Sequence, residues 1–383
     1  MRSGVGSYIG ALVHVAIGRK LAVLSGSERI YLDHAATTPM LPEARAAVGA
    51  AMEAWANPSS PHADGRRARA AFEEARRRIA EELDWRHDVI LTSGASEAIQ
   101  IASARAQAPR RIVGPTEHDA VTAAMGEAAE VLPIDGNGLI DLAALETALA
   151  GGPALVAIQL VNNETGVIQH IERIQGIVRT AGSLLLADCA QAAGKIALPE
   201  ADFIAVSAHK FGGPPGAGAL LVRDLARLRA SGGQERGYRR GTENWPAVAG
   251  MAAALASHTF AEAMPRLETL RESLEREILS EGGVVIAAGA PRIATIGAYA
   301  MPGVASASQL VQLDLAGISV SAGSACSSGS LKTSRVLGAM GLAPDIAASV
   351  IRVSFGPGTT EADVDRFVSD WRRIKERAGR AAA

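Results

Sequence analysis

Between about residues 64 and 222 the chain alternates helical patterns with short apolar runs. In the first helical pattern, apolar residues recur every three or four positions from Ala68 to Leu83, and arginines and glutamates fill the opposite face. This pattern predicts an amphipathic surface helix. A long charged pattern that begins near residue 264 predicts another helix.

The apolar runs that separate these helical patterns predict strands. Several of them are apolar throughout, which is typical of strands buried on both faces by covering helices. The alternation predicts an α/β fold with a mostly parallel seven-stranded sheet, whose ligands bind beyond the carboxyl ends of the strands. The candidate strands lie at 89–92, 111–113, 131–133, 154–160, 183–187, 203–207 and 218–222.

The pattern changes after residue 264, where short strands near 284–298 and 318–320 precede a Gly/Ser loop at 321–330. A strand at 350–355 and a closing helix follow. These elements predict a second, smaller α+β domain. The predicted division is a poorly ordered leader (1–29), a large domain (41–263) and a small domain (30–40 with 264–383).

The leader includes a mildly apolar stretch at 4–17, followed by Arg19 and Lys20. This stretch is too short and too rich in glycine to span a bilayer, so no membrane anchor is predicted. A signal peptide and a transit peptide both remain open, since no acidic residue precedes Glu28. An unstructured leader is the preferred interpretation.

Composition narrows the possible partners. The 383 residues hold 38 Lys and Arg against 40 Asp and Glu, a balance that offers no electrostatic footprint for nucleic acid or membrane surfaces. Small molecules and other proteins are the expected partners. The two cysteines, Cys189 and Cys326, are too few for a disulfide framework and indicate a reducing, cytoplasmic setting.

Candidate chemistry follows the predicted strands. Ser93-Gly94-Ala95-Ser96 joins a strand to a helix N-terminus, which suits either an anion site or an ordinary serine N-cap. Asp188 follows the apolar strand 183–187, where a buried carboxylate needs a cationic or hydrogen-bonding partner. A protonated pyridine nitrogen would serve, and so would a helix cap.

Lys210 follows the strand 203–207 and precedes a Gly/Pro-rich stretch. A desolvated lysine amine is a good nucleophile toward carbonyl compounds. The neighbouring Ser207 and His209 can both bond phosphate oxygens. Together these residues favour a covalent cofactor site over a solvated loop lysine.

Nine segments along the chain form a series of motifs. They are YLDHAATTP at 31–39, TSGASEA at 92–98, EHDAV at 117–121, VNNETGVIQ at 161–169, DCAQAAGK at 188–195, SAHKFGGPPG at 207–216, RRGTEN at 239–244, GSACSSGSL at 323–331 and IRVSFGPGTTE at 351–361. In this order the segments resemble the cysteine desulfurases, a branch of the class V, fold-type-I family of pyridoxal-phosphate (PLP) enzymes. The resemblance runs from Tyr31 to the end of the chain and implies that family's fold, with a long mobile loop that carries a reactive cysteine.

The resemblance implies a role for each matching residue. Lys210 would bind PLP covalently, Asp188 would pair with the ring nitrogen, Gln191 would contact the phenolate oxygen and His118 would stack on the ring. Asn163 and Arg352 would bind the substrate carboxylate, for which a planar guanidinium is suited. The phosphate would be held by Ala95, Ser96, Ser207 and His209, and by Thr242 of a neighbouring subunit, which implies a homodimer.

Cys326 lies within the small-residue run 323–330, which is a poor place to bury a thiol. The resemblance implies that Cys326 takes sulfur from L-cysteine as a persulfide, leaving alanine, and passes it to an acceptor such as an iron–sulfur scaffold. Cys189 is interpreted as a packing residue behind Asp188. No metal is predicted.

Three positions depart from the family's usual residues, namely Pro215, Arg240 and Lys332-Thr333. They leave open the details of phosphate binding, dimer contact and loop anchoring. Two alternatives to a cysteine desulfurase therefore stay in view. One is another class V reaction, such as selenocysteine cleavage or transamination, and the other is a non-catalytic relative.

Overall fold

A computed structural model describes residues 29–322 and 334–382 of the chain. Residues 1–28 of the predicted leader lie outside the described residues. So does the segment 323–333, and with it Cys326.

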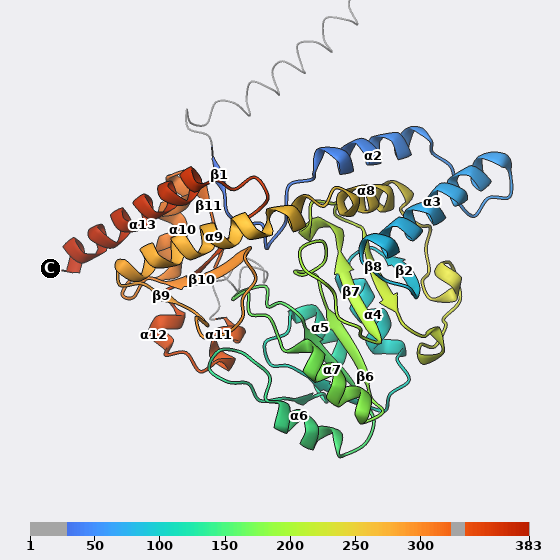
Figure 1. Cartoon of the computed structure of the whole chain (residues 1–383), viewed down its shortest axis with the longest axis horizontal. Helices are drawn as coiled ribbons and strands as arrows, with labels where there is room; N and C mark the ends of the chain where they lie inside the picture. The colour runs from blue at the N-terminus through green and yellow to red at the C-terminus, as the bar shows by residue number, and fades with distance from the viewer. Residues whose placement is uncertain (1–28, 323–333, 383) are drawn as a thin grey trace, which may run out of the picture.

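A seven-stranded sheet forms the centre of the larger part of the molecule (Figure 1). Its strand order is β2-β8-β7-β6-β5-β3-β4; β8 is antiparallel to both neighbours, and the other pairs are parallel. This confirms the predicted fold class, and each strand overlaps one of the predicted runs. The strands are β2 (Asp88–Thr92), β3 (Arg110–Val113), β4 (Glu130–Val131), β5 (Ala154–Gln159), β6 (Leu184–Asp188), β7 (Phe203–Ser207) and β8 (Gly218–Val222).

Helices cover both faces of this sheet, because successive side chains of its buried strands point to opposite faces. Leu185 packs in one core with Phe72 of α3, whereas Leu184 and Leu186 pack in another with Ile99 of α4. The helices of this part are α2 (Pro42–Glu53), α3 (Ala63–Glu82), α4 (Ala95–Arg105), α5 (Asp119–Met125), α6 (Leu142–Leu149), α7 (Ile171–Thr180) and α8 (Trp245–Ala256). Short 3-10 turns lie at Ala208–Lys210, Leu225–Arg227 and Glu235–Gly237.

The second part of the molecule has its own core, in which Leu32 packs with residues such as Leu274 and Trp371. An antiparallel sheet in the order β12-β10-β9 lies against this core. A separate pair of parallel strands is formed by β1 and β11. Its elements are β1 (Ile30–Tyr31), α9 (Thr259–Ser280), β9 (Val284–Val285), β10 (Ile296–Ala300), α10 (Ser306–Leu315), β11 (Ile318–Ser319), α11 (Arg335–Ala339), α12 (Pro344–Ala347), β12 (Val350–Ser354) and α13 (Glu361–Ala382).

The long helix α9 contributes to both parts, since Phe260 belongs to the core of the large sheet and Leu267 to the second core. The predicted boundary near residue 264 stays a prediction that these two cores support. Among the residues that the structure describes, no helix combines the length and the apolarity needed to cross a membrane.

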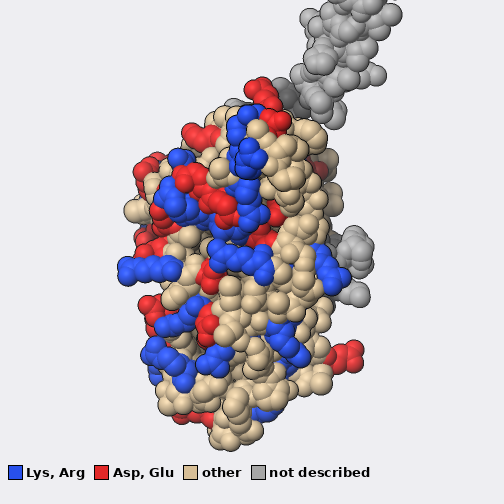
Figure 2. Space-filling model, turned by 90° about the vertical axis from the view of Figure 1, so that its right-hand side faces the viewer, with Lys and Arg blue, Asp and Glu red and all other residues tan. Residues whose placement is uncertain are grey.

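Basic and acidic side chains are interspersed over the face shown in Figure 2. The mixed signs leave this face without the single-sign field that nucleic acids require. Exposed ion pairs also lie along α3, where Arg77 contacts Glu74 and Glu81, and Arg78 contacts Glu74. Such exposed pairs add little stability.

Candidate active site

A cavity of about 420 Å³ lies beyond the carboxyl ends of β2, β6 and β7. This is where a mostly parallel sheet is expected to bind its ligands. Ten of the residues predicted from the sequence line it: Ala95, Ser96, His118, Asn163, Asp188, Gln191, Ser207, His209, Lys210 and Arg352. All except Arg352, which belongs to β12, come from the part of the chain that forms the large sheet.

Lys210 ends the short turn that follows β7 and reaches the segment ahead of α2. Its Nζ donates hydrogen bonds to the carbonyl oxygens of Ala35, at 2.7 Å, and Ala36, at 2.8 Å. The Ala35 carbonyl also accepts a hydrogen bond from Gln191 Nε2, at 2.9 Å. The segment around Ala35 therefore sets the position of both side chains.

Asp188 is the last residue of β6 and is only 8% exposed. Its Oδ1 accepts a hydrogen bond from the Ala190 N–H at 3.0 Å. Burial raises the pKa of the carboxyl, while the Ala190 N–H and the nearby His118 and Lys210 oppose that rise. A cationic ring nitrogen placed against Asp188 would favour its ionised form.

His118 is the N-cap of α5, and its Nδ1 accepts a hydrogen bond from the Ala120 N–H at 3.1 Å. In a neutral imidazole this bond leaves the proton on Nε2. The hydrogen bond from Ala120 thus fixes the His118 ring, which lines the cavity.

The part of the cavity next to the N-terminus of α4 suits an anion. Gly94 is the N-cap of α4 and Ser96 lies in its first turn, so the interpretation of Ser96 as an ordinary N-cap is wrong. The first N–H groups of a helix have no partner within it and lie at the positive end of the helix dipole. Ser207 and His209 also line the cavity, and burial, with a smaller effect of Lys210, lowers the pKa of His209 to about 4.

Arg352 enters the cavity from the second part of the molecule and is 2% exposed. It donates hydrogen bonds to the Asn163 carbonyl at 2.9 Å and to Asp33 Oδ1 at 2.8 Å. Its Nε is buried and has no hydrogen-bond partner among the described residues. An arginine stays charged in proteins, so this group offers a fixed cation with donors still available to a ligand carboxylate.

Two predicted residues stand apart from this cavity. Thr242 is exposed and does not line it, so its predicted contact with a neighbouring subunit stays a prediction. Cys326 lies outside the described residues, and its role also stays a prediction.

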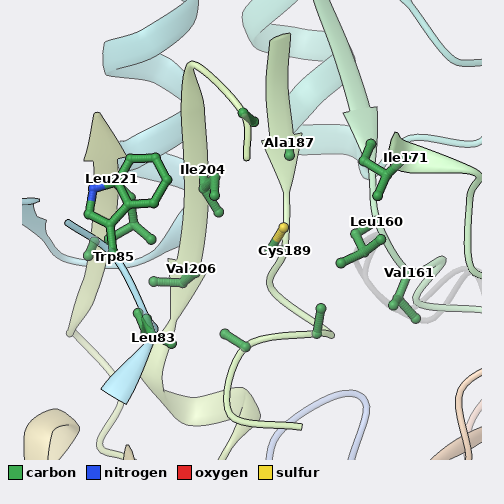
Figure 3. Close-up of a cluster of buried hydrophobic side chains, with 14 of the residues drawn as sticks. Leu83, Trp85, Leu160, Val161, Ile171, Ala187, Cys189, Ile204, Val206 and Leu221 are labelled. Atoms are coloured by element: carbon green, nitrogen blue, oxygen red, sulfur yellow. The ribbon is translucent and has the colours of Figure 1, made fainter. Parts of the chain in front are cut away.

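The other cysteine is buried. Cys189 lies between β6 and the turn that follows, among apolar side chains that include Ala187 and Leu160 (Figure 3). Burial, and to a smaller extent the charge of Asp188, raises the pKa of its thiol well above the ordinary value. The thiolate needed for nucleophilic chemistry is therefore disfavoured at Cys189.

Several residues that shape the cavity were not singled out by the sequence analysis. Asp33, Ala35 and Ala36 lie in the YLDHAATTP motif, which was noted without a role for any of its members. Arg335, in the first turn of α11, donates hydrogen bonds to the Pro115 and Glu117 carbonyls just ahead of His118. No local pattern marks such long-range contacts, although the motif itself was a usable signal.

The residues present fit pyridoxal phosphate. An amine that can bind an aldehyde, a buried carboxylate suited to a ring cation, an imidazole and an anion site all border one cavity. A second cavity, of about 490 Å³ beside Trp85 and His258, is also bordered by an amine and by imidazoles, but none of the carboxylates that line it is buried.

Comparisons with known proteins agree with this geometry. Residues 30–367 match the family model described as aminotransferase class-V. A cysteine desulfurase from Cereibacter sphaeroides is 36% identical over 89% of this chain and 94% of its own. An IscS-like cysteine desulfurase from Mycobacterium tuberculosis is 38% identical over 92% of this chain and 98% of its own.

The solved structure of a NifS-like protein from Rickettsia africae superposes with a TM-score of 0.82 at 29% identity, covering 91% of this chain and all of that one. A structure titled SspA in complex with cysteine gives a TM-score of 0.74 at 27% identity and covers 86% of this chain. The chain therefore belongs to the cysteine desulfurases of the class-V aminotransferase family, and it is a pyridoxal-phosphate-dependent enzyme.

Proposed function

We propose that this protein is an L-cysteine desulfurase that releases L-alanine and retains the sulfur as a persulfide on Cys326. The observation that carries this proposal is the meeting of Lys210, Asp188 and Arg352 around one cavity, although they come from distant parts of the chain. A lysine and a buried aspartate suit the cofactor, and the arginine suits an amino-acid carboxylate.

Bound pyridoxal phosphate supplies an electron sink that makes the α-proton of an amino acid acidic and its sulfur able to leave. Asp188 would hold the ring nitrogen in its protonated form, which keeps that sink effective. Lys210 would hold the cofactor and would accept the α-proton of the substrate at its Nζ. Arg352 and Asn163 hold the carboxylate, so that the substrate cannot turn in the site.

Cys326 completes the sulfur chemistry in this proposal. Its thiolate attacks the substrate sulfur, a sulfur–sulfur bond forms as the carbon–sulfur bond breaks, and the carbon skeleton keeps the electron pair and leaves as alanine after protonation. Cys189 does not compete, because it is buried and its raised pKa keeps it as a thiol.

The names of the relatives support the choice of substrate and of acceptor class. One solved relative is described as a complex with cysteine, and one curated relative is described as IscS-like. We infer that the sulfur goes to an acceptor protein, such as an iron–sulfur scaffold, in the cytoplasm. We also infer a homodimer, in which the exposed Thr242 segment reaches the phosphate of the other subunit.

The test is to add L-cysteine to the cofactor-loaded protein and to measure alanine and protein-bound sulfur. A desulfurase forms both in equal amounts during the first turnover. A selenocysteine lyase gives alanine only from selenocysteine, an aminotransferase requires an oxo-acid acceptor, and a non-catalytic relative gives no product. Sedimentation of the same sample tests the dimer.

A further inference from the structure

Lys195 is a buried lysine that the proposed chemistry does not use. It is 6% exposed and lies on the turn after β6, where Gly194 adopts a φ of +71°. Its Nζ lies 3.5 Å from Gln191 Oε1 and 5.2 Å from the centre of the Phe260 ring. No described carboxylate acts on its charge, which is rare for a buried lysine.

The titratable groups near Lys195 include no acid with which its amine could form an ion pair. The titratable groups that act on it, or on which it acts, are Lys210, His34 and His209, none of which is acidic. Burial first and Lys210 second lower the pKa of Lys195 to about 7. Both the charged and the neutral amine carry N–H groups, so Lys195 can donate a hydrogen bond on either side of neutral pH.

Lys195 contacts the oxygen end of the Gln191 side-chain amide. The oxygen and nitrogen ends of a glutamine are nearly equal in size but opposite in hydrogen bonding, so their partners decide which way the amide faces. Gln191 Oε1 faces the donor Lys195, and Gln191 Nε2 donates to the Ala35 carbonyl at 2.9 Å. The two contacts favour the same orientation, and Nε2 has a second hydrogen to offer to a ligand.

We propose that Lys195 is a positioning residue that fixes the Gln191 amide with its N–H toward the phenolate oxygen of the cofactor. This inference rests on the proposed function and on the contact of Gln191 with that oxygen that the family resemblance implies. Without Lys195 the Gln191 oxygen loses its donor, and the amide can turn an oxygen toward the negative phenolate. That contact would be repulsive where the N–H contact is attractive.

The experiment is a pH titration of the visible absorption of the cofactor-loaded protein, which reports the pKa of the nitrogen that links Lys210 to the cofactor. A donor on the phenolate oxygen draws negative charge away from that nitrogen and lowers its pKa. Gln191→Leu is therefore expected to raise this pKa by about one to two pH units, the shift that corresponds to a hydrogen bond to a charged group. Lys195→Met is expected to raise it in the same direction.

Three further variants sharpen the result. The double variant Lys195→Met with Gln191→Leu is expected to match Gln191→Leu alone, because the two residues act in series. Lys195→Arg is expected to restore most of the original pKa, since arginine also donates and the 490 Å³ cavity that borders Lys195 leaves room for it. Lys375→Met, at an exposed position of α13, is the matched control and is expected to change nothing.

The outcomes separate this inference from the proposed function. A shift in Gln191→Leu without one in Lys195→Met overturns the role of Lys195 and leaves the function standing. No shift in either variant overturns the Gln191 contact as well, while the alanine and sulfur assay still decides the reaction. If Lys195→Met does not fold, Lys195→Gln replaces it, because its side chain is one atom shorter and cannot reach Gln191.

Discussion

The two walls of the cavity are built differently. The wall formed by the large sheet places its groups at strand ends. Asp188 ends β6 and Lys210 follows β7, so the pairing of these two strands fixes the positions of both residues. The opposite wall depends on a contact between segments far apart in the sequence, since Arg352 is held by Asp33 and by the Asn163 carbonyl. The first wall suits a resident cofactor, and the second suits a substrate that enters and leaves.

This difference can be tested, in order of decreasing expected effect on cysteine turnover. Lys210→Ala is expected to abolish both turnover and the visible absorption of lysine-bound cofactor, because Lys210 both binds the cofactor and accepts the α-proton in this proposal. Absorbance after incubation with cofactor and dialysis is the measurement. Lys375→Ala is the control, and a lysine-bound cofactor that survives in Lys210→Ala would place the site elsewhere.

Cys326→Ala is expected to stop sulfur transfer and leave the sheet wall intact. The variant should bind the cofactor and change its absorption when cysteine is added, since these steps need no protein thiol. Alanine and persulfide should fall to background, whereas Cys189→Ala should keep both. Mass spectrometry after one turnover should find one added sulfur on the wild-type peptide that contains Cys326. Sulfur on Cys189 instead would show that the nucleophile is wrongly assigned.

The sequence predicted the sheet wall well because its signals are local. Runs such as 203–207 are apolar on both faces, and a polar residue directly after such a run marks a strand end. The edge strand β4 was harder to predict. The predicted run 131–133 overlaps β4 only at Val131, which is exposed, so burial does not impose an apolar pattern there.

The substrate wall was predicted only through family resemblance. Nothing near Arg352 in the sequence indicates that Asp33 lies 2.8 Å away, because that contact depends on how two segments 319 residues apart pack. Lys195 was missed for a related reason. It follows a glycine and reads as a surface lysine, and only the tertiary structure reveals its burial.

Arg352→Lys is expected to damage the substrate wall alone. Lysine keeps the charge but loses the planar set of donors, and a hydrogen bond to a charged group is worth about 1.5 to 3 kcal/mol, or roughly a 10- to 100-fold rise in KM. Steady-state kinetics should show that rise with cofactor absorption unchanged. Arg271→Lys, at a buried arginine of the second core, is the matched control. An unchanged KM would remove Arg352 from the substrate site.

The smallest effect on turnover is expected from the titration of Lys195. This titration should instead change how the free energy of unfolding depends on pH. Its folded pKa of about 7 lies below the ordinary lysine value of about 10.4, so the unfolded chain binds the extra proton at intermediate pH. The contribution of this group to the free energy of unfolding should therefore rise as the pH increases from about 7 toward 10, by about 1.4 kcal/mol per pH unit at most.

Urea denaturation of the cofactor-free protein at pH 7, 8 and 9 measures this rise. At pH 7 the charge of Lys195 in the unfolded chain favours unfolding, so Lys195→Met should be more stable than the wild type, and its advantage should shrink at each higher pH. Groups with shifted pKa values on which Lys195 does not act, such as the Cys189 thiol, are common to both proteins and cancel in the difference. Lys375→Met, at an exposed position of α13, is the matched control. A constant difference for Lys195→Met would mean that Lys195 stays charged when folded and needs an anionic partner on the sheet wall.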